Sequence, residues 1–185
     1  MSKQEKMLSP VGEVKFVSLD KPDTKLAKSE DEGKYRVSLV LDPKDAGHKK
    51  FLAKLKKLAE EKHPKGRKPY KEDKDRDGVE TGKILVSFQS TYKPKVFDKY
   101  GQDIPEDVVV GNGSVCQMCF VPAYYEVTVN KGMTLYIQAV KVIELVEFGG
   151  RTAEDFGFDV EEAPEDAGFE GVEEGDDEGF DEDHF

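Results

Sequence analysis

Basic and aromatic residues are interleaved in one short stretch of the sequence, YKPKVFDKY (residues 92–100). Lysine side chains can neutralise phosphate groups, and aromatic rings can stack on unpaired bases, each worth about 1–3 kcal/mol. A strand with a polar face, earlier in the chain, adds two further cations. We therefore predict that seven residues contact a nucleic-acid single strand: Lys34, Arg36, Tyr92, Lys93, Lys95, Lys99 and Tyr100. The alternative is that Phe97 and one tyrosine are core residues and that the lysines are ordinary surface residues.

A second basic segment, residues 44–71, contains 11 basic and 3 acidic residues. A run of lysines on a helix is usually only its solvated face. The functional alternative is a patch that attracts nucleic acid or an acidic segment of the chain.

Two motifs resemble metal sites but lack essential ligands. The loop DKDRDGVETGKI (residues 73–84) has the first acidic positions of a calcium loop, but Ile84 stands where a bidentate Glu is needed. We predict a polar turn there. Cys116 and Cys119 are only two zinc ligands, and residues three apart on a strand face opposite sides of it. We predict packed thiols, and no metal or cofactor.

The sequence also lacks the patterns of common catalytic sites. It has no glycine loop followed by Lys-Ser/Thr for phosphate binding, since GNG (residues 111–113) is a turn signature. The chain has three His residues, and none stands in a recognisable arrangement with a nucleophile. We predict that the protein is not an enzyme.

The last 35 residues are strongly acidic. Residues 151–185 hold 16 Asp or Glu and one Arg, a net charge of −15, which leaves +4 for residues 1–150 of a chain that carries −11. Such a segment buries too little apolar surface to offset its ordering entropy. We predict one folded domain (1–150) and a disordered tail (151–185). Recurring phenylalanines, ending in Phe185, favour an interaction tail over one that only improves solubility.

The remaining patterns predict strands joined by turns. Residues 11–19 form a strand with Val14, Phe16 and Ser18 on one face. Further strands are predicted at 34–41, 83–90, 114–125 and 133–146, with a turn at residues 130–132. Asp42 and Pro43 signal a helix start, and an apolar stripe from Phe51 to Ala59 extends the helix towards His63. This is a small, mainly β, mostly antiparallel barrel or sandwich with one helix.

The composition also limits where the protein works. No apolar run approaches the roughly 18 residues of a membrane span, and the N-terminus lacks the apolar region of a secretory signal. Two Cys residues in such a chain are expected to be reduced thiols. We expect a cytoplasmic protein that does not enter a membrane.

Residues 83–98, 111–126, 130–148 and the terminal DEDHF resemble the replicative single-stranded DNA-binding proteins of tailed bacteriophages. The resemblance implies an OB-fold-like, antiparallel five-stranded barrel with one helix and an acidic tail ending in Phe. It implies coating of single-stranded DNA and strand annealing in phage replication, recombination and repair, in the host cytoplasm. It also implies dimers, and tail contacts with the phage DNA polymerase and helicase–primase. The residues expected to make the tail contacts are Phe180, Asp181, Glu182, Asp183 and Phe185.

One feature departs from the common OB layout, because the helix follows the second predicted strand instead of the third. Two other functions stay open at this point: an RNA-binding or annealing module, and a protein–protein adaptor that acts through its tail. In the leading hypothesis, the seven residues named above bind single-stranded DNA, and the tail competes with DNA for the basic surface.

Overall fold

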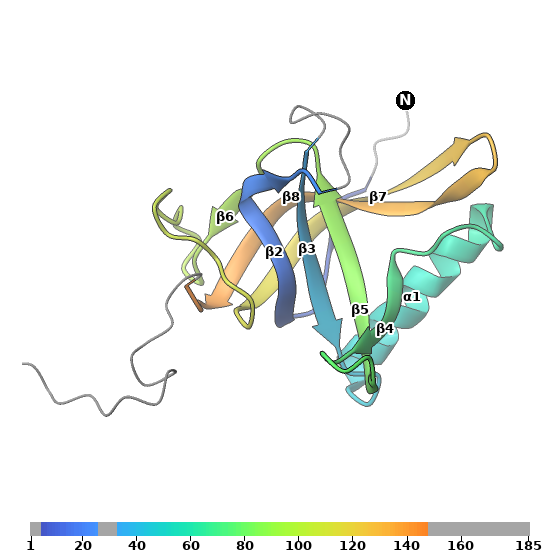
Figure 1. Cartoon of the computed structure of the whole chain (residues 1–185), viewed down its shortest axis with the longest axis horizontal. Helices are drawn as coiled ribbons and strands as arrows, with labels where there is room; N and C mark the ends of the chain where they lie inside the picture. The colour runs from blue at the N-terminus through green and yellow to red at the C-terminus, as the bar shows by residue number, and fades with distance from the viewer. Residues whose placement is uncertain (1–4, 26–32, 148–185) are drawn as a thin grey trace, which may run out of the picture. The chain divides into compact units, whose positions relative to one another are not determined.

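A closed ring of five strands forms the centre of the fold in a computed structural model, which describes residues 5–25 and 33–147 (Figure 1). The elements along the chain are β1 (Met7–Leu8), β2 (Gly12–Asp23), β3 (Lys34–Leu41), α1 (Ala46–Lys62), β4 (Tyr70–Lys74), β5 (Glu80–Ser90), β6 (Lys95–Phe97), β7 (Val115–Val127) and β8 (Asn130–Glu144).

The ring runs in the order β2, β3, β5, β8, β7 and back to β2. Its pairings are antiparallel except the one between β5 and β8, which is parallel at Gln89 and Tyr136. Strand directions cannot alternate throughout a ring with an odd number of strands, so one parallel pairing is unavoidable. The expectation of a mainly β, OB-like five-stranded ring with one helix is therefore confirmed, although the ring is not antiparallel throughout.

The short strands extend this ring at its edges. β1 pairs with β7, β6 pairs in parallel with β8, and β4 pairs with β5. None of these three strands is predicted from the sequence. β4 has the sequence YKEDK, in which only Asp73 is fully buried, so it shows no apolar alternation.

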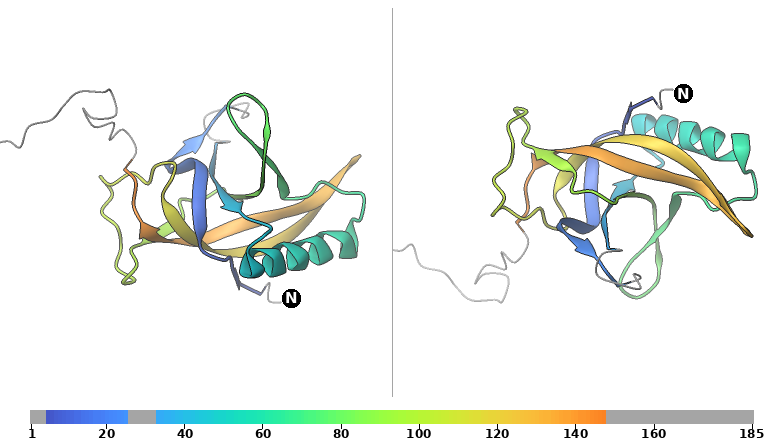
Figure 2. Two further views of the ribbon diagram at one scale, coloured as in Figure 1. Left: turned by 90° about the horizontal axis from the view of Figure 1, so that it is seen from below. Right: turned by 90° about the horizontal axis from the view of Figure 1, so that it is seen from above.

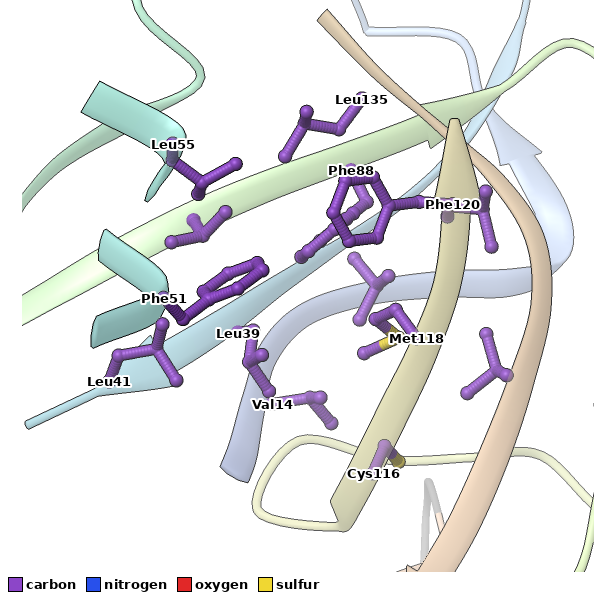
Figure 3. Packing of buried hydrophobic residues seen from close by; sticks show 14 of the residues in the cluster. Val14, Leu39, Leu41, Phe51, Leu55, Phe88, Cys116, Met118, Phe120 and Leu135 are labelled. Carbon is purple, nitrogen blue, oxygen red and sulfur yellow. The ribbon is translucent and has the colours of Figure 1, made fainter. Parts of the chain in front are cut away.

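Apolar side chains from the ring and from α1 fill one core (Figure 3). Phe120 lies at its centre, with its ring centroid 5.2 Å from that of Phe88 and 6.0 Å from that of Phe51 on the helix, both edge-to-face. Such pairs add about 0.5–1.5 kcal/mol beyond the area they bury. The predicted helical stripe is confirmed, because Phe51, Leu55 and Ala59 are buried.

The helix begins later than predicted. Its N-cap is Asp45, whose carboxylate accepts a hydrogen bond from the backbone N–H of His48 at 2.9 Å. Asp42, the predicted cap, instead accepts from the N–H of Lys44 in a preceding turn. Both Asp42 and Asp45 have the short side-chain acceptor that a cap needs. Asp42 uses its carboxylate in the turn that precedes the helix, so Asp45 becomes the cap. Within the described part of the chain, no helix has the length and apolar character to cross a membrane.

The β7–β8 hairpin is long and runs beside α1 in both views of Figure 2. The Tyr124 hydroxyl donates to the carbonyl oxygen of Leu58 at 2.8 Å, and the Lys62 ammonium lies 4.6 Å from the Tyr124 ring centroid. The hairpin turns at Thr128 and Val129, because Val127 pairs with Asn130. The predicted turn at residues 130–132 is wrong, since these residues already belong to β8.

Candidate nucleic-acid interface

A groove of about 1220 Å³ runs across the outer face of β2, β3, β5 and β8. It continues to the segment before β4 and to the distal ends of β7 and β8. Seven basic residues and one acidic residue line it, a net charge of +6: Lys25, Lys34, Arg36, Arg67, Lys68, Lys71 and Lys131, with Asp23. This surface is more basic than the whole of residues 1–150, so positive charge is concentrated in the groove.

β3 supplies two of these cations through simple alternation. Val37 and Leu39 point into the core and are almost fully buried, whereas Lys34 and Arg36 take the opposite, groove-facing side. The Nε atom of Arg36 is buried and has no hydrogen-bond partner among the described residues. A buried charged donor without an acceptor is costly. No acidic side chain within the described residues forms an ion pair with Arg36, so its positive charge is not offset there.

A second group of cations comes from the segment that follows α1. Arg67 bonds to β8 through its backbone: its N–H donates to the Lys131 carbonyl at 2.7 Å, and its carbonyl accepts from the Met133 N–H at 3.0 Å. This contact requires Gly132, because a Cβ atom there would lie 2.5 Å from the Arg67 carbonyl oxygen. Lys131 thereby lines the same groove as Arg67, Lys68 and Lys71, although about 60 residues separate it from them in the sequence.

Aromatic rings lie among these cations. Phe16 is 64% exposed and Tyr136 is 38% exposed, and Tyr70 and Tyr125 also line the groove. Phe88 is buried beneath them. Cations with accessible rings are the combination that binds a single strand, since charge attracts the phosphates and rings stack on bases.

The seven predicted contact residues are divided between two places. Lys34 and Arg36 line the groove, whereas Tyr92, Lys93, Lys95, Lys99 and Tyr100 do not. Tyr92 is 84% exposed and Tyr100 is 78% exposed, and the Lys99 ammonium lies 5.2 Å from the Tyr100 ring centroid. The segment flanks β6 at the edge of the sheet. Its contact with DNA stays a prediction, separate from the groove.

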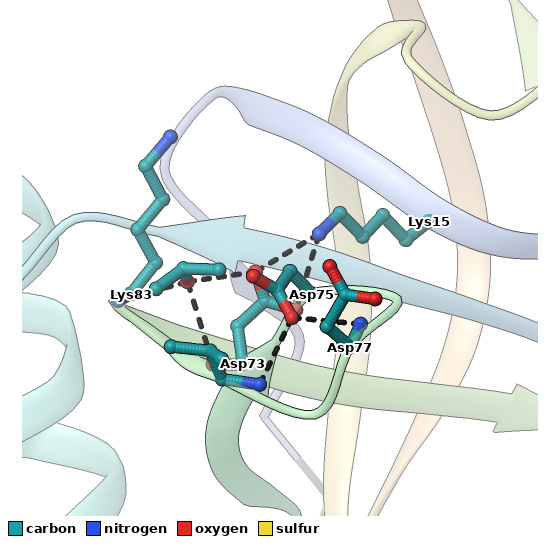
Figure 4. Close-up of polar contacts among 7 residues, drawn as sticks. Lys15, Asp73, Asp75, Asp77 and Lys83 are labelled. Carbon is teal, nitrogen blue, oxygen red and sulfur yellow. Dashed lines mark hydrogen bonds and ion pairs between the residues drawn. The ribbon is translucent and has the colours of Figure 1, made fainter.

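The acidic loop that resembles a calcium site has a structural role (Figure 4). Asp73 is 1% exposed, and its carboxylate accepts hydrogen bonds from Lys15 Nζ at 2.9 and 3.1 Å and from the Thr81 hydroxyl at 2.9 Å. Burial raises the pKa of Asp73, but the bonds from Lys15 and Thr81 outweigh burial, and the pKa lies below its ordinary value. Asp75 accepts from the N–H groups of Asp77 and Val79, which shapes the predicted polar turn.

The two cysteines face opposite sides of β7, as the spacing predicts. Cys116 is fully buried, and burial raises the pKa of its thiol to about 12, while Cys119 is half-buried on the other face. One ion cannot bind both sulfurs in this arrangement. Within residues 5–25 and 33–147, no cluster of three or more His, Cys, Asp or Glu side chains could hold a metal.

Several groove residues are missed by sequence reasoning. Tyr125 and Tyr136 lie on predicted strands that were assigned only core residues, and Lys131 lies in the segment predicted as a turn. Phe16 is predicted to share a face with Val14. The basic segment 44–71 was a usable signal, although only its last part lines the groove. The predicted tail contacts, Phe180 to Phe185, lie outside the described residues.

No family model matches the chain, and no curated protein sequence matches it either. The fold is similar to that of several solved structures. The single-stranded DNA-binding protein gp2.5 encoded by bacteriophage T7 has a TM-score of 0.61 and 21% identity, over 88% of this chain and 98% of its own. The single-stranded DNA-binding protein of bacteriophage Enc34, in complex with single-stranded DNA, has a TM-score of 0.60 and 18% identity, over 78% of this chain and 89% of its own.

At these identities the likeness establishes the fold. The neighbours are phage single-stranded DNA-binding proteins, so the resemblance predicted from the sequence is confirmed at the level of three-dimensional structure. A second structure of the Enc34 single-stranded DNA-binding protein is also similar, with a TM-score of 0.58 and 20% identity.

Proposed function

We propose that this chain is a non-enzymatic protein that binds single-stranded DNA with little sequence preference. The observation that carries the proposal is the groove, in which seven cations and one carboxylate surround exposed aromatic rings. The fold supports it, because OB folds bind oligonucleotides on the face formed by their second and third strands. β3 and β5 are those strands here, and both line the groove.

The chemistry of the groove accounts for weak sequence preference. Lysine and arginine side chains neutralise phosphates, which every nucleotide carries, and rings stack on any base. Stacking requires bases that are not paired, so the groove should favour single strands over duplex. Each phosphate neutralised on a single strand makes the slope of log affinity against log salt steeper by about 0.7, so binding should weaken strongly with salt.

The biological role follows from this activity and from the tail. The protein coats and anneals exposed strands during phage DNA replication, recombination and repair in the host cytoplasm. Residues 151–185 compete with DNA for the groove and recruit the phage DNA polymerase and helicase–primase. Phe185 offers a ring for an apolar pocket, worth roughly 1.5–3 kcal/mol when buried, beside a carboxylate for a basic rim. We include a homodimer in this proposal because the family resemblance implies one.

A competition experiment tests the proposed function. Labelled oligo-dT is titrated with the full-length protein at two salt concentrations and then displaced by unlabelled oligo-dT, oligo-U or duplex DNA. We expect salt-sensitive binding, displaced best by oligo-dT and least by duplex. Equal or better displacement by oligo-U would favour the RNA-binding alternative, since the groove geometry alone does not select against a 2′-hydroxyl. Absence of salt-sensitive binding would contradict the proposal and favour an adaptor that acts through its tail.

A further inference from the structure

Phe16 occupies an irregular position in β2. Lys15 pairs with Ser38 and Ser18 pairs with Arg36, so the two residues Phe16 and Val17 stand opposite the single residue Val37. This is a β-bulge, one extra residue on one strand. The bulge reverses the alternation of β2, and it therefore exposes Phe16, which the sequence predicts on the same face as buried Val14.

The backbone of Phe16 is strained. Its φ angle is 53°, in the left-handed region that favours glycine, and the first residue of a bulge with this geometry is normally a glycine. Phe16 gains little from packing in return, because its side chain is 64% exposed. A bulky residue in this conformation, without burial, indicates a role other than stability of the fold.

Two contacts fix the bulge from its two sides. Before Phe16, the ammonium of Lys15 bonds to the buried carboxylate of Asp73 on β4. After it, the N–H of Val17 donates to Asn112 Oδ1 at 3.1 Å. Asn112 lies in the turn before β7. Because the residues on both sides are held by other elements, the fold fixes the backbone at Phe16 and hence the side of the strand from which its side chain projects.

Phe16 lines the same groove as the cations that would hold a DNA backbone. Phe16 lines the groove together with Arg36, whose neighbour across the strand pair is Ser18. A phosphate held by Arg36 would place the adjoining base within the same part of the groove. An exposed phenyl ring among cations offers no hydrogen bonds, so its contribution to binding is stacking or apolar contact.

We propose that Phe16 is a base-stacking platform, held in an unfavourable backbone conformation by Lys15–Asp73 and Asn112. This inference rests on the proposed function, and it assigns the stacking to a residue outside the lysine- and tyrosine-rich segment at 92–100. Lys15, Asp73 and Asn112 are positioning residues, since they act through Phe16.

The first test is Phe16→Gly, which removes the ring and permits the left-handed backbone. We expect affinity for oligo-dT to fall roughly 5- to 150-fold, the equivalent of one stacked base, while the melting temperature stays level or rises. The matched control is Thr128→Gly. Thr128 also has a left-handed φ, 52°, but does not line the groove. For Thr128→Gly the melting temperature should also stay level or rise, but the affinity for oligo-dT should not change.

The second test uses the absence of tryptophan from the chain. Phe16→Trp introduces the single tryptophan of the chain, whose emission can be excited apart from that of the seven tyrosines, and stacking on a base should quench it as oligo-dT is added. Val79→Trp, at an exposed position outside the groove, should respond much less. If wild type binds oligo-dT but Phe16→Gly binds equally well, or the two tryptophans respond alike, the stacking role is wrong while the proposed function stands. If wild type itself does not bind, both fail.

Discussion

Asp73 is a buried carboxylate, so its charge has to be compensated within the protein. Lys15 provides the compensation from β2, although its own side chain remains 32% exposed. A buried acceptor that loses a hydrogen-bond partner costs about 1–3 kcal/mol. The pair also adjoins Phe16, so this single contact links the stability of the barrel to the shape of the groove.

Lys15→Met should therefore destabilise the protein by about 1–3 kcal/mol at neutral pH. Because the folded-state pKa of Asp73 lies below the unfolded value of 3.8, the stabilisation is fully present above that value and is lost as the pH falls through the folded pKa. The free energy of unfolding, measured by urea titration between neutral pH and about pH 2.5, should show a gap between wild type and variant that shrinks with acid.

The control is Lys54→Met, which removes a lysine on the exposed face of α1 that forms no ion pair within the described part of the chain. Its stability should stay close to that of wild type at every pH. A gap for Lys15→Met that persists unchanged at the acid end would contradict the role given to the ion pair.

The face of a strand on which a residue lies can be predicted from the sequence only where inward-facing and outward-facing residues alternate without interruption. β3 alternates without interruption, so Lys34 and Arg36 are placed correctly on the outer face. In β2 one extra residue shifts the register, and Phe16 is predicted on the wrong side. A bulge whose first residue has a left-handed backbone normally has glycine at that position. Here the position holds Phe, so the sequence contained no such signal.

At the scale of elements, apolar periodicity carries most of the information. β3 is predicted over its observed bounds, and the long strands β5, β7 and β8 are predicted with end shifts of a few residues. Each of these strands buries one face in the core. β4 and β6 are missed because strand formation there depends on pairing with a neighbour at an edge of the sheet, which local sequence does not reveal.

The groove itself depends on contacts between distant elements. The basic segment before β4 joins β8 through backbone hydrogen bonds at Arg67, and Gly132 makes room for them. From the sequence, Asn130-Lys131-Gly132 looks like a hairpin turn, since Asn and Gly favour turns. The glycine instead permits close approach of a second segment. The charge composition therefore predicts that a basic surface exists. Where that surface lies can be known only from the tertiary structure, because distant segments meet to form it.

At the scale of the whole molecule, charge is divided between the two parts of the chain. Residues 151–185 carry −15, whereas residues 1–150 carry +4 and concentrate their cations in the groove. Opposite charges on one chain attract at high effective concentration, and the attraction weakens as salt screens it. The tail should therefore act as an intramolecular competitor of DNA.

Deleting residues 151–185 should raise the affinity for oligo-dT, and the gain should be largest at low salt. Titration of the truncated and full-length proteins at low and high salt measures this. Phe185→Ala is the matched control, because it keeps every acidic residue and should leave DNA affinity nearly unchanged while weakening the binding of a replisome partner. Equal affinities of the truncated and full-length proteins at low salt would show that the tail does not compete.

We propose that a DNA strand lies in the groove that crosses the outer face of β2, β3, β5 and β8. The most direct measurement is the salt dependence of oligo-dT affinity for three variants. Lys34→Ala/Arg36→Ala removes two groove cations, and Lys54→Ala/Lys57→Ala removes two exposed lysines of α1 that do not line the groove. Lys93→Ala/Lys95→Ala/Lys99→Ala tests whether the strand also reaches the segment at β6.

We predict that the groove variant flattens the slope of log affinity against log salt by about 1.4, since each lost phosphate contact on a single strand contributes about 0.7. The α1 variant should keep the wild-type slope. A flatter slope for the triple variant would add the β6 segment to the binding path. If the groove variant binds with wild-type affinity and slope, or loses no more than the α1 variant, DNA does not occupy the groove.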